Sequence, residues 1–172
     1  MRNPLTTTHS GLKTTDMSKD LLHYEDFNVG DTNIFGEFAM SADLIREYAA
    51  EWDPQPFHLD EELANASVLG GLCASGWQVC AIINRLMVMA YANNAAGMGS
   101  FGVDQVKWMK PVYTTDVLTL RYAVLEKRVS SRRPEMGIVR MRWEAINQDG
   151  VTKTEMTGTN LFGVRAAREM AS

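Results

Sequence analysis

Apolar and polar residues alternate in the second half of the chain. An apolar residue recurs at every second position from Leu118 to Val124, and the same alternation returns over 139–145. A two-residue period is typical of a strand that buries one face. Turn-forming residues at 147–150 separate the second stretch from a third, which runs to about Val164. The pattern predicts three or four long antiparallel strands, with a loop and strand over 24–38 and a candidate strand over 103–108.

The first half of the chain shows the period of helices instead. Ser41 is a candidate N-cap for a helix that ends near residue 52, because Pro54 disfavours the α conformation of the residue before it. A short helix is expected over 60–66. Ser75 caps a longer helix over 76–91, which is apolar on nearly every side and must therefore be surrounded by protein.

These elements predict a single α+β domain. A sheet curled around one buried helix accommodates the order of strand, helices and long antiparallel strands. We assign the domain to residues 20–166. Residues 1–19 are rich in Thr and Ser with little to bury, so we expect a flexible N-terminal tail, and residues 167–172 form a C-terminal tail.

Composition and charge narrow the class of protein. The 172 residues are 45% hydrophobic and 22% charged, with a net charge of −4, as in an ordinary globular protein. Nucleic acid as a partner is disfavoured, since its binders carry a basic excess. No secretory signal is apparent, and the longest apolar stretch, 77–91, is interrupted and shorter than the ~20 residues of a membrane span. We expect a cytoplasmic protein with no membrane association.

Metal and thiol chemistry are not favoured. The three histidines are His9, His23 and His58, and of these only His58 is expected in the folded body. They show no metal-ligand spacing, so no metal site is predicted. Cys73 and Cys80 are expected on one face of a helix, too far apart for a disulfide, as two small buried side chains.

The segment 53–58 presents a carboxylate and an imidazole. Pro54 and Pro56 are expected to hold its backbone extended, with Asp53 and His58 projecting from a stiff loop. Such a pair can deprotonate a water molecule and return the proton, because histidine ordinarily titrates near neutral pH. The alternative is a proline-rich helix stop with His58 on the surface.

The segment 70–77 is a glycine-containing turn that leads into the apolar helix. The first turn of a helix has unpaired N–H groups at the positive end of its dipole. Gly76 has no side chain to obstruct a ligand, so its N–H is a candidate donor to an oxygen that gains negative charge. The alternative is an ordinary N-cap with glycines that allow close packing.

Together the two segments carry a resemblance to a known family. Asp-x-x-Pro-x-His over 53–58, followed by Gly-Leu-Cys-Ala-Ser-Gly-Trp over 71–77 at the start of an apolar helix, resembles the MaoC-like dehydratases. The better-known members of that family are (R)-specific enoyl-CoA hydratases with a hot-dog fold. The resemblance extends from about Tyr24 to Val164 and includes residues 107–112.

The resemblance implies roles for individual residues. Asp53 and His58 match the pair that holds and activates water, and Gly76 matches the glycine whose N–H binds the thioester oxygen. Gln55 and Ser75 stand where well-studied hydratases commonly have Asn and His. These two residues and Trp77 are expected to contact the substrate.

The same resemblance implies the substrate class and the assembly. The substrate would be an acyl-CoA or an acyl-carrier-protein thioester, no cofactor would be needed, and the protein would form a homodimer or a higher homo-oligomer. Basic residues are candidate contacts for the nucleotide of CoA: Lys107, Lys110, Arg128, Arg132 and Arg133.

Two other functions stay open. One is a hot-dog acyl-CoA thioesterase, although many of these place a carboxylate on the central helix and residues 76–91 contain no Asp or Glu. The other is a non-catalytic protein that binds acyl thioesters, since a fold alone does not settle function.

Overall fold

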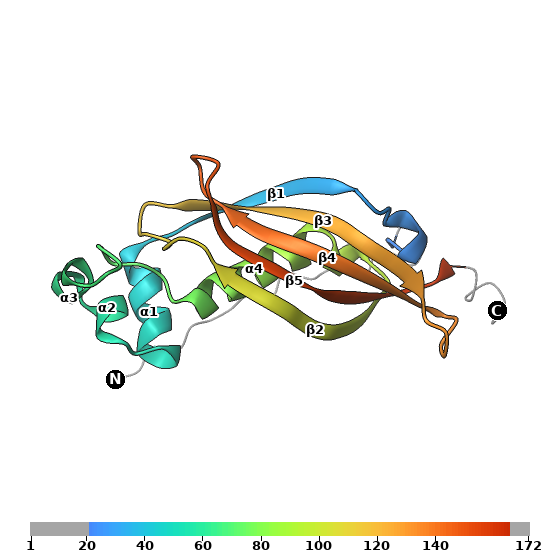
Figure 1. Cartoon of the computed structure of the whole chain (residues 1–172), viewed down its shortest axis with the longest axis horizontal. Helices are drawn as coiled ribbons and strands as arrows, with labels where there is room; N and C mark the ends of the chain where they lie inside the picture. Colours follow the sequence, from blue (N-terminus) through green and yellow to red (C-terminus); the bar gives the residue numbers. More distant parts are fainter. Residues whose placement is uncertain (1–20, 166–172) are drawn as a thin grey trace, which may run out of the picture.

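A five-stranded antiparallel sheet curls around one long helix in the computed structural model, which describes residues 21–165 (Figure 1). The sheet order is β1-β3-β4-β5-β2. The strands are β1 (Thr32–Ala39), β2 (Gly97–Trp108), β3 (Val117–Val129), β4 (Met136–Ile146) and β5 (Thr152–Gly163). This architecture confirms the predicted α+β class. The predicted tails, 1–19 and 167–172, lie outside the described residues.

The central strands form where the apolar alternation predicted them. Leu118 and Leu120 of β3 and Val139 and Met141 of β4 are fully buried against the helix side of the sheet. β2 begins at Gly97, six residues before the expected start at 103. Its first half is rich in glycine, and its pairing with β5 has register shifts there, so it carries no alternating apolar signal.

The long helix α4 (Gly76–Ala90) supplies the other half of the core. The Ser75 hydroxyl caps it by accepting a hydrogen bond from Trp77 N–H at 3.3 Å. Ile83 and Leu86 are buried under the sheet, and burial of such a side chain stabilises the fold by about 1.5–3 kcal/mol. Trp77 and Met89 are exposed, so this chain alone does not surround the helix on every side.

Three short helices gather at the end of the sheet where α4 begins (Figure 1). They are α1 (Ala42–Trp52), α2 (Pro56–Leu59) and α3 (Glu61–Ala66). Ser41 caps α1 by accepting from Leu44 N–H, as predicted. The expectation of an extended loop over 53–58 is wrong in part. Pro56 begins α2, because the fixed φ of proline suits the first position of a helix.

The cysteines also differ from expectation. Cys73 precedes α4 and forms an isolated bridge with Tyr113, so the two cysteines do not share a helix face. Both are buried and free. Within residues 21–165 no helix is long and apolar enough to cross a membrane. The cytoplasmic location stays a prediction.

Candidate active site

Asp53 and His58 lie face to face at the junction of α1 and α2. Asp53 ends α1 and His58 belongs to α2, and Oδ2 of Asp53 is 3.6 Å from Nε2 of His58. The imidazole is only 5% exposed, which excludes the alternative of a surface histidine. A separation of 3.6 Å is longer than a direct hydrogen bond.

A backbone carbonyl fixes the tautomer of His58. Nδ1 lies 2.8 Å from the carbonyl oxygen of Cys73. Because a carbonyl oxygen only accepts, Nδ1 carries the hydrogen and Nε2 of the neutral ring presents a lone pair toward Asp53. The ring therefore meets a bound water as an acceptor.

The carboxylate of Asp53 is held in its ionised form. A hydrogen bond from the Ser75 hydroxyl is the main reason that its pKa lies below the usual value, and partial burial opposes this effect. Gln55 Nε2 donates to Oδ1 at 2.8 Å and lowers the pKa of Asp53 further, as would a positive charge on His58. Asp53 is thus an anion at neutral pH and available as a base.

The N-terminus of α4 contributes a free donor. Gly76 N–H has no hydrogen-bond acceptor among residues 21–165. The indole of Trp108 covers this glycine so closely that an added Cβ would lie 2.5 Å from Nε1. Trp77 packs edge-on against the same indole, with ring centroids 5.4 Å apart. Glycine is therefore required here on steric grounds.

These groups line one cavity of about 510 Å³, a volume within the range of small-molecule sites. The candidate catalytic, oxyanion and substrate-contact residues from the sequence all lie on its wall: Asp53, Gln55, His58, Ser75, Gly76 and Trp77. The rest of the wall is largely apolar and includes Phe57, Leu69, Val79, Trp108, Met109 and Val112. A carboxylate, an imidazole acceptor and an N–H donor thus converge on one largely apolar cavity.

Residues 28–144 match the family model described as the MaoC like domain. The chain belongs to the MaoC-like dehydratase family. It is 31% identical over 127 residues to the uncharacterized protein YdeM of Bacillus subtilis, which covers 74% of this chain and 89% of YdeM. Membership of this family favours hydratase or dehydratase chemistry in general terms.

Solved structures resemble the chain over most of its length. A MaoC-like dehydratase from Rhodospirillum rubrum is 36% identical, with a TM-score of 0.75 over 84% of this chain and 98% of that one. The R-hydratase PhaJ1 from Pseudomonas aeruginosa is 22% identical, with a TM-score of 0.67 over 83% and 86% of the two chains, and shows the shared fold. The fold is the hot-dog fold, as the resemblance implied.

Sequence reasoning about this MaoC-like protein missed two parts of the site. One is Trp108, whose only sequence signal was its place in the family-like stretch 107–112. The other is the Cys73 carbonyl, since a backbone acceptor leaves no mark in the sequence. The prediction that His23 lies outside the folded body is wrong, because it is 8% exposed and its Nδ1 is 2.8 Å from the Leu21 carbonyl.

The candidate cations are spread widely over the structure. Lys110 lines the cavity, whereas Lys107 pairs with Glu155 at 3.2 Å. Arg132 and Arg133 belong to the hairpin between β3 and β4, at the opposite end of the sheet from α1 (Figure 1). Within the described residues 21–165 no group of three or more His, Cys, Asp or Glu side chains is arranged to hold a metal ion.

Proposed function

We propose that this protein is an acyl-thioester hydro-lyase that adds water reversibly to a trans-2-enoyl thioester. In reverse it dehydrates the 3-hydroxyacyl thioester. The observation that carries the proposal is the convergence of ionised Asp53, the Nε2 lone pair of His58 and the free N–H of Gly76 on one apolar cavity. Family membership and the fold shared with an R-hydratase support the same chemistry.

The water would be held between Asp53 and His58. As its oxygen bonds to C3 of the enoyl group, the pair removes one proton, and the same pair delivers a proton to C2. One O–H bond and the π bond between C2 and C3 break while one C–O and one C–H bond form, so the addition balances without an oxidant. The two residues titrate as a coupled unit, and we assign the proton to the pair.

Negative charge develops on the thioester oxygen as C3 is attacked. Gly76 N–H, at the positive end of the α4 dipole, is the donor that would stabilise this enolate. Removal of one such donor typically raises a barrier by about 3–4 kcal/mol. This role requires the thioester carbonyl to lie beside the Trp108 indole.

The remaining candidate residues would arrange the substrate around this centre. Gln55 hydrogen-bonds the Asp53 carboxylate, and the Ser75 hydroxyl lowers its pKa, so both orient the base. Trp77 is 60% exposed at the rim and would contact the arm of the thioester beyond the carbonyl. Lys110 is the candidate contact for the phosphates of CoA or of an acyl-carrier protein.

We also propose that the protein is a homodimer joined through β2. Nearly every residue of this edge strand is exposed, and Phe101 and Val103 present large apolar side chains to solvent. A free edge of twelve residues is a template for strand pairing, and a second copy would cover it.

The first experiment follows the enoyl-thioester absorbance of crotonyl-CoA and, in parallel, the release of free thiol. The proteins compared are wild type, Asp53→Asn, His58→Gln and the matched control Glu51→Gln, which removes an exposed carboxylate two residues from Asp53. We expect wild type and Glu51→Gln to consume the enoyl group without releasing thiol, and the two site variants to lose this activity while staying folded.

Other outcomes would contradict the proposal. Release of thiol by wild type would indicate a thioesterase. Absence of both signals across straight-chain and branched enoyl-CoAs would indicate a protein that binds acyl thioesters without catalysis. Full activity of Asp53→Asn would remove the carboxylate from the mechanism.

A further inference from the structure

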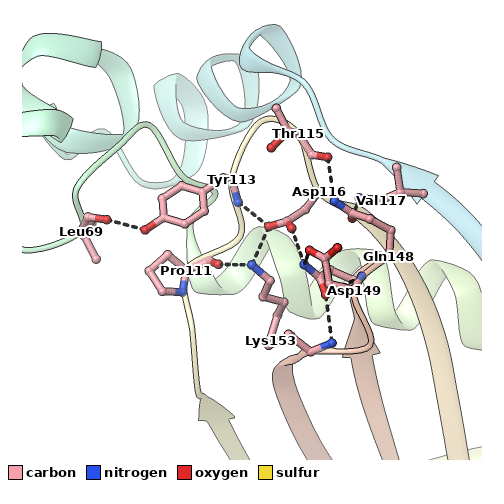
Figure 2. Close-up of polar contacts among 11 residues, drawn as sticks. Leu69, Pro111, Tyr113, Thr115, Asp116, Val117, Gln148, Asp149 and Lys153 are labelled. Carbon is pink, nitrogen blue, oxygen red and sulfur yellow. Dashed lines mark hydrogen bonds and ion pairs between the residues drawn. The ribbon is translucent and has the colours of Figure 1, made fainter.

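A buried ion pair lies outside the cavity, at the end of the sheet where the site forms (Figure 2). Asp116 and Lys153 are 4% and 6% exposed, and Lys153 Nζ is 2.8 Å from Asp116 Oδ2. Neither residue belongs to the wall of the site. Burial of two charges carries a large desolvation cost. We therefore consider which neighbouring groups the pair holds in place.

The carboxylate of Asp116 is fully engaged. It accepts hydrogen bonds from Tyr113 N–H at 2.8 Å and from Asn147 Nδ2 at 2.9 Å, in addition to Lys153. Burial acts to raise the pKa of Asp116, but hydrogen bonds from Lys153 and Asn147 outweigh this and leave the pKa below the usual value. Asp116 is therefore a permanent anion that ties the start of β3 to the segment before it.

Lys153 also binds the segment before β3, through both its side chain and its backbone. Its Nζ donates to the Pro111 carbonyl at 3.0 Å, and its own carbonyl accepts from Met109 N–H and Lys110 N–H. The chain from Met109 to Tyr113 is thus held by both the side chain and the backbone of one residue. Met109, Lys110, Pro111 and Val112 are also wall residues of the cavity.

This segment in turn holds the acceptor of His58. Ala74 N–H donates to the Val112 carbonyl at 2.8 Å, and Cys73 forms an isolated bridge with Tyr113. The Cys73 carbonyl is the group that accepts from His58 Nδ1. A continuous path of hydrogen bonds and backbone therefore leads from the ion pair to the imidazole.

Tyr113 adds a second attachment from the same segment. Its hydroxyl donates to the Leu69 carbonyl at 2.6 Å, and Leu69 lines the cavity (Figure 2). The path therefore fixes both the histidine and the wall beside it.

We propose that Asp116 and Lys153 are positioning residues for the Asp53–His58 pair. The ion pair holds the 111–113 backbone, and this backbone fixes the position of the Cys73 carbonyl. That carbonyl keeps the hydrogen of His58 on Nδ1 and leaves Nε2 for the water. The catalytic part of this inference rests on the proposed hydro-lyase function. The structural part, that this path sets the tautomer of His58, does not depend on that function.

Lys153→Met removes the cation and keeps an apolar stem of similar length. Pro111 loses its donor and the carboxylate loses its counterion, so the Cys73 carbonyl shifts relative to His58. A misplacement of about 1 Å in such a supporting element lowers catalysis by roughly tenfold to hundredfold. We expect kcat to fall in this range, with KM changed less than threefold, because the backbone carbonyl of residue 153 still accepts from Met109 N–H and Lys110 N–H and keeps that part of the wall in place.

The test reads the tautomer directly, by ¹⁵N–¹H correlation of the imidazole nitrogens in the full chain. Wild type is expected to show His58 protonated at Nδ1 alone, and Lys153→Met is expected to show both tautomers. Asp116→Asn is nearly isosteric and serves as the milder variant if Lys153→Met does not fold. The matched control is Glu144→Gln, which removes the charge of a buried carboxylate that accepts two hydrogen bonds from Arg121 in the sheet and makes no hydrogen bond to 111–113.

The outcomes separate the two proposals. Altered His58 spectra in Lys153→Met or Asp116→Asn, with an unchanged spectrum in Glu144→Gln, support the positioning role even if no substrate is hydrated. Unchanged spectra in both variants of the pair overturn it, whatever the activity. An equal change in Glu144→Gln also overturns it, because the effect would then be a general loss of stability.

Discussion

Gly76→Ala is the substitution that most directly tests the geometry of the site. The added Cβ would lie 2.5 Å from Trp108 Nε1 and Cε2, whereas carbon contacts ordinarily fall near 3.5–4.0 Å. The indole or the start of α4 must therefore move by about 1 Å. Movement of the helix start displaces the Gly76 N–H, and movement of the indole displaces the wall residue beside it.

The expected loss of activity is large and the expected loss of stability is small. Misplacement by about 1 Å, or loss of an oxyanion donor, lowers kcat/KM roughly a hundredfold, which corresponds to about 2.7 kcal/mol. Overpacking costs about 1–3 kcal/mol of folding free energy, and the higher helix propensity of alanine recovers up to about 1 kcal/mol. Activity should therefore fall while the protein stays folded.

Enoyl-CoA hydration kinetics and thermal unfolding on the same samples measure both effects. Gly71→Ala is the matched control, because its Cβ would meet Tyr113 Cε1 at an ordinary 3.4 Å and activity should change less than twofold. A Gly76→Ala/Trp108→Leu double variant relieves the contact and should recover part of the loss. The reasoning is refuted if Gly76→Ala keeps more than a third of wild-type kcat/KM, or if Gly71→Ala loses as much.

Three further predictions concern pH dependence, the core and the assembly. Ser75→Ala removes the group that does most to lower the pKa of Asp53, so the acid limb of the kcat/KM profile should move to higher pH. The control Ser41→Ala removes only a helix cap and should leave that limb in place. An unmoved limb in Ser75→Ala would contradict the assignment of the limb to Asp53. Ile83→Ala should lower the free energy of unfolding in urea by about 2–5 kcal/mol, since Ile83 is 1% exposed; a cost under 1 kcal/mol would contradict its place in the core. Phe101→Lys places a charge on the exposed β2 edge, so light scattering should show a monomer in place of a dimer. Ile34→Lys, on the opposite edge strand β1, should leave the dimer intact. A monomeric wild type would exclude the β2 dimer.

The sequence predicts well those elements whose residues carry their own periodic signal. Buried residues alternate with half-buried ones over 117–120 of β3 and over 139–143 of β4, and α1 and α4 begin at serines whose hydroxyls cap them. Such features depend on neighbours in the chain, so they can be read locally. The candidate residues of the site were also within reach, because the 53–58 and 71–77 motifs stand close together in the sequence.

Other features depend on contacts between distant segments, and the sequence carries little sign of them. The prolines of 53–58 fit either an extended loop or the start of α2, and it is α2 that turns His58 inward. The start of β2 is glycine-rich, and it becomes a strand by pairing with β5. The partner of His58 Nδ1 is a carbonyl fifteen residues away, which no side-chain pattern could reveal.

Ser75 connects the stability of the helix with the chemistry of the site. Its one hydroxyl accepts from Trp77 N–H at the start of α4 and also lowers the pKa of the Asp53 carboxylate. The carboxylate is thereby held beside the positive end of the helix dipole, which stabilises an anion. The enolate oxygen would lie at the same helix end, on Gly76 N–H. In the proposed hydration the Asp53–His58 pair takes up a proton as the enolate forms, so negative charge at this helix end would pass from the pair to the thioester oxygen within one reaction step. The dipole then favours the ionised base before the step and the enolate during it, so one structural element lowers the energy of both states.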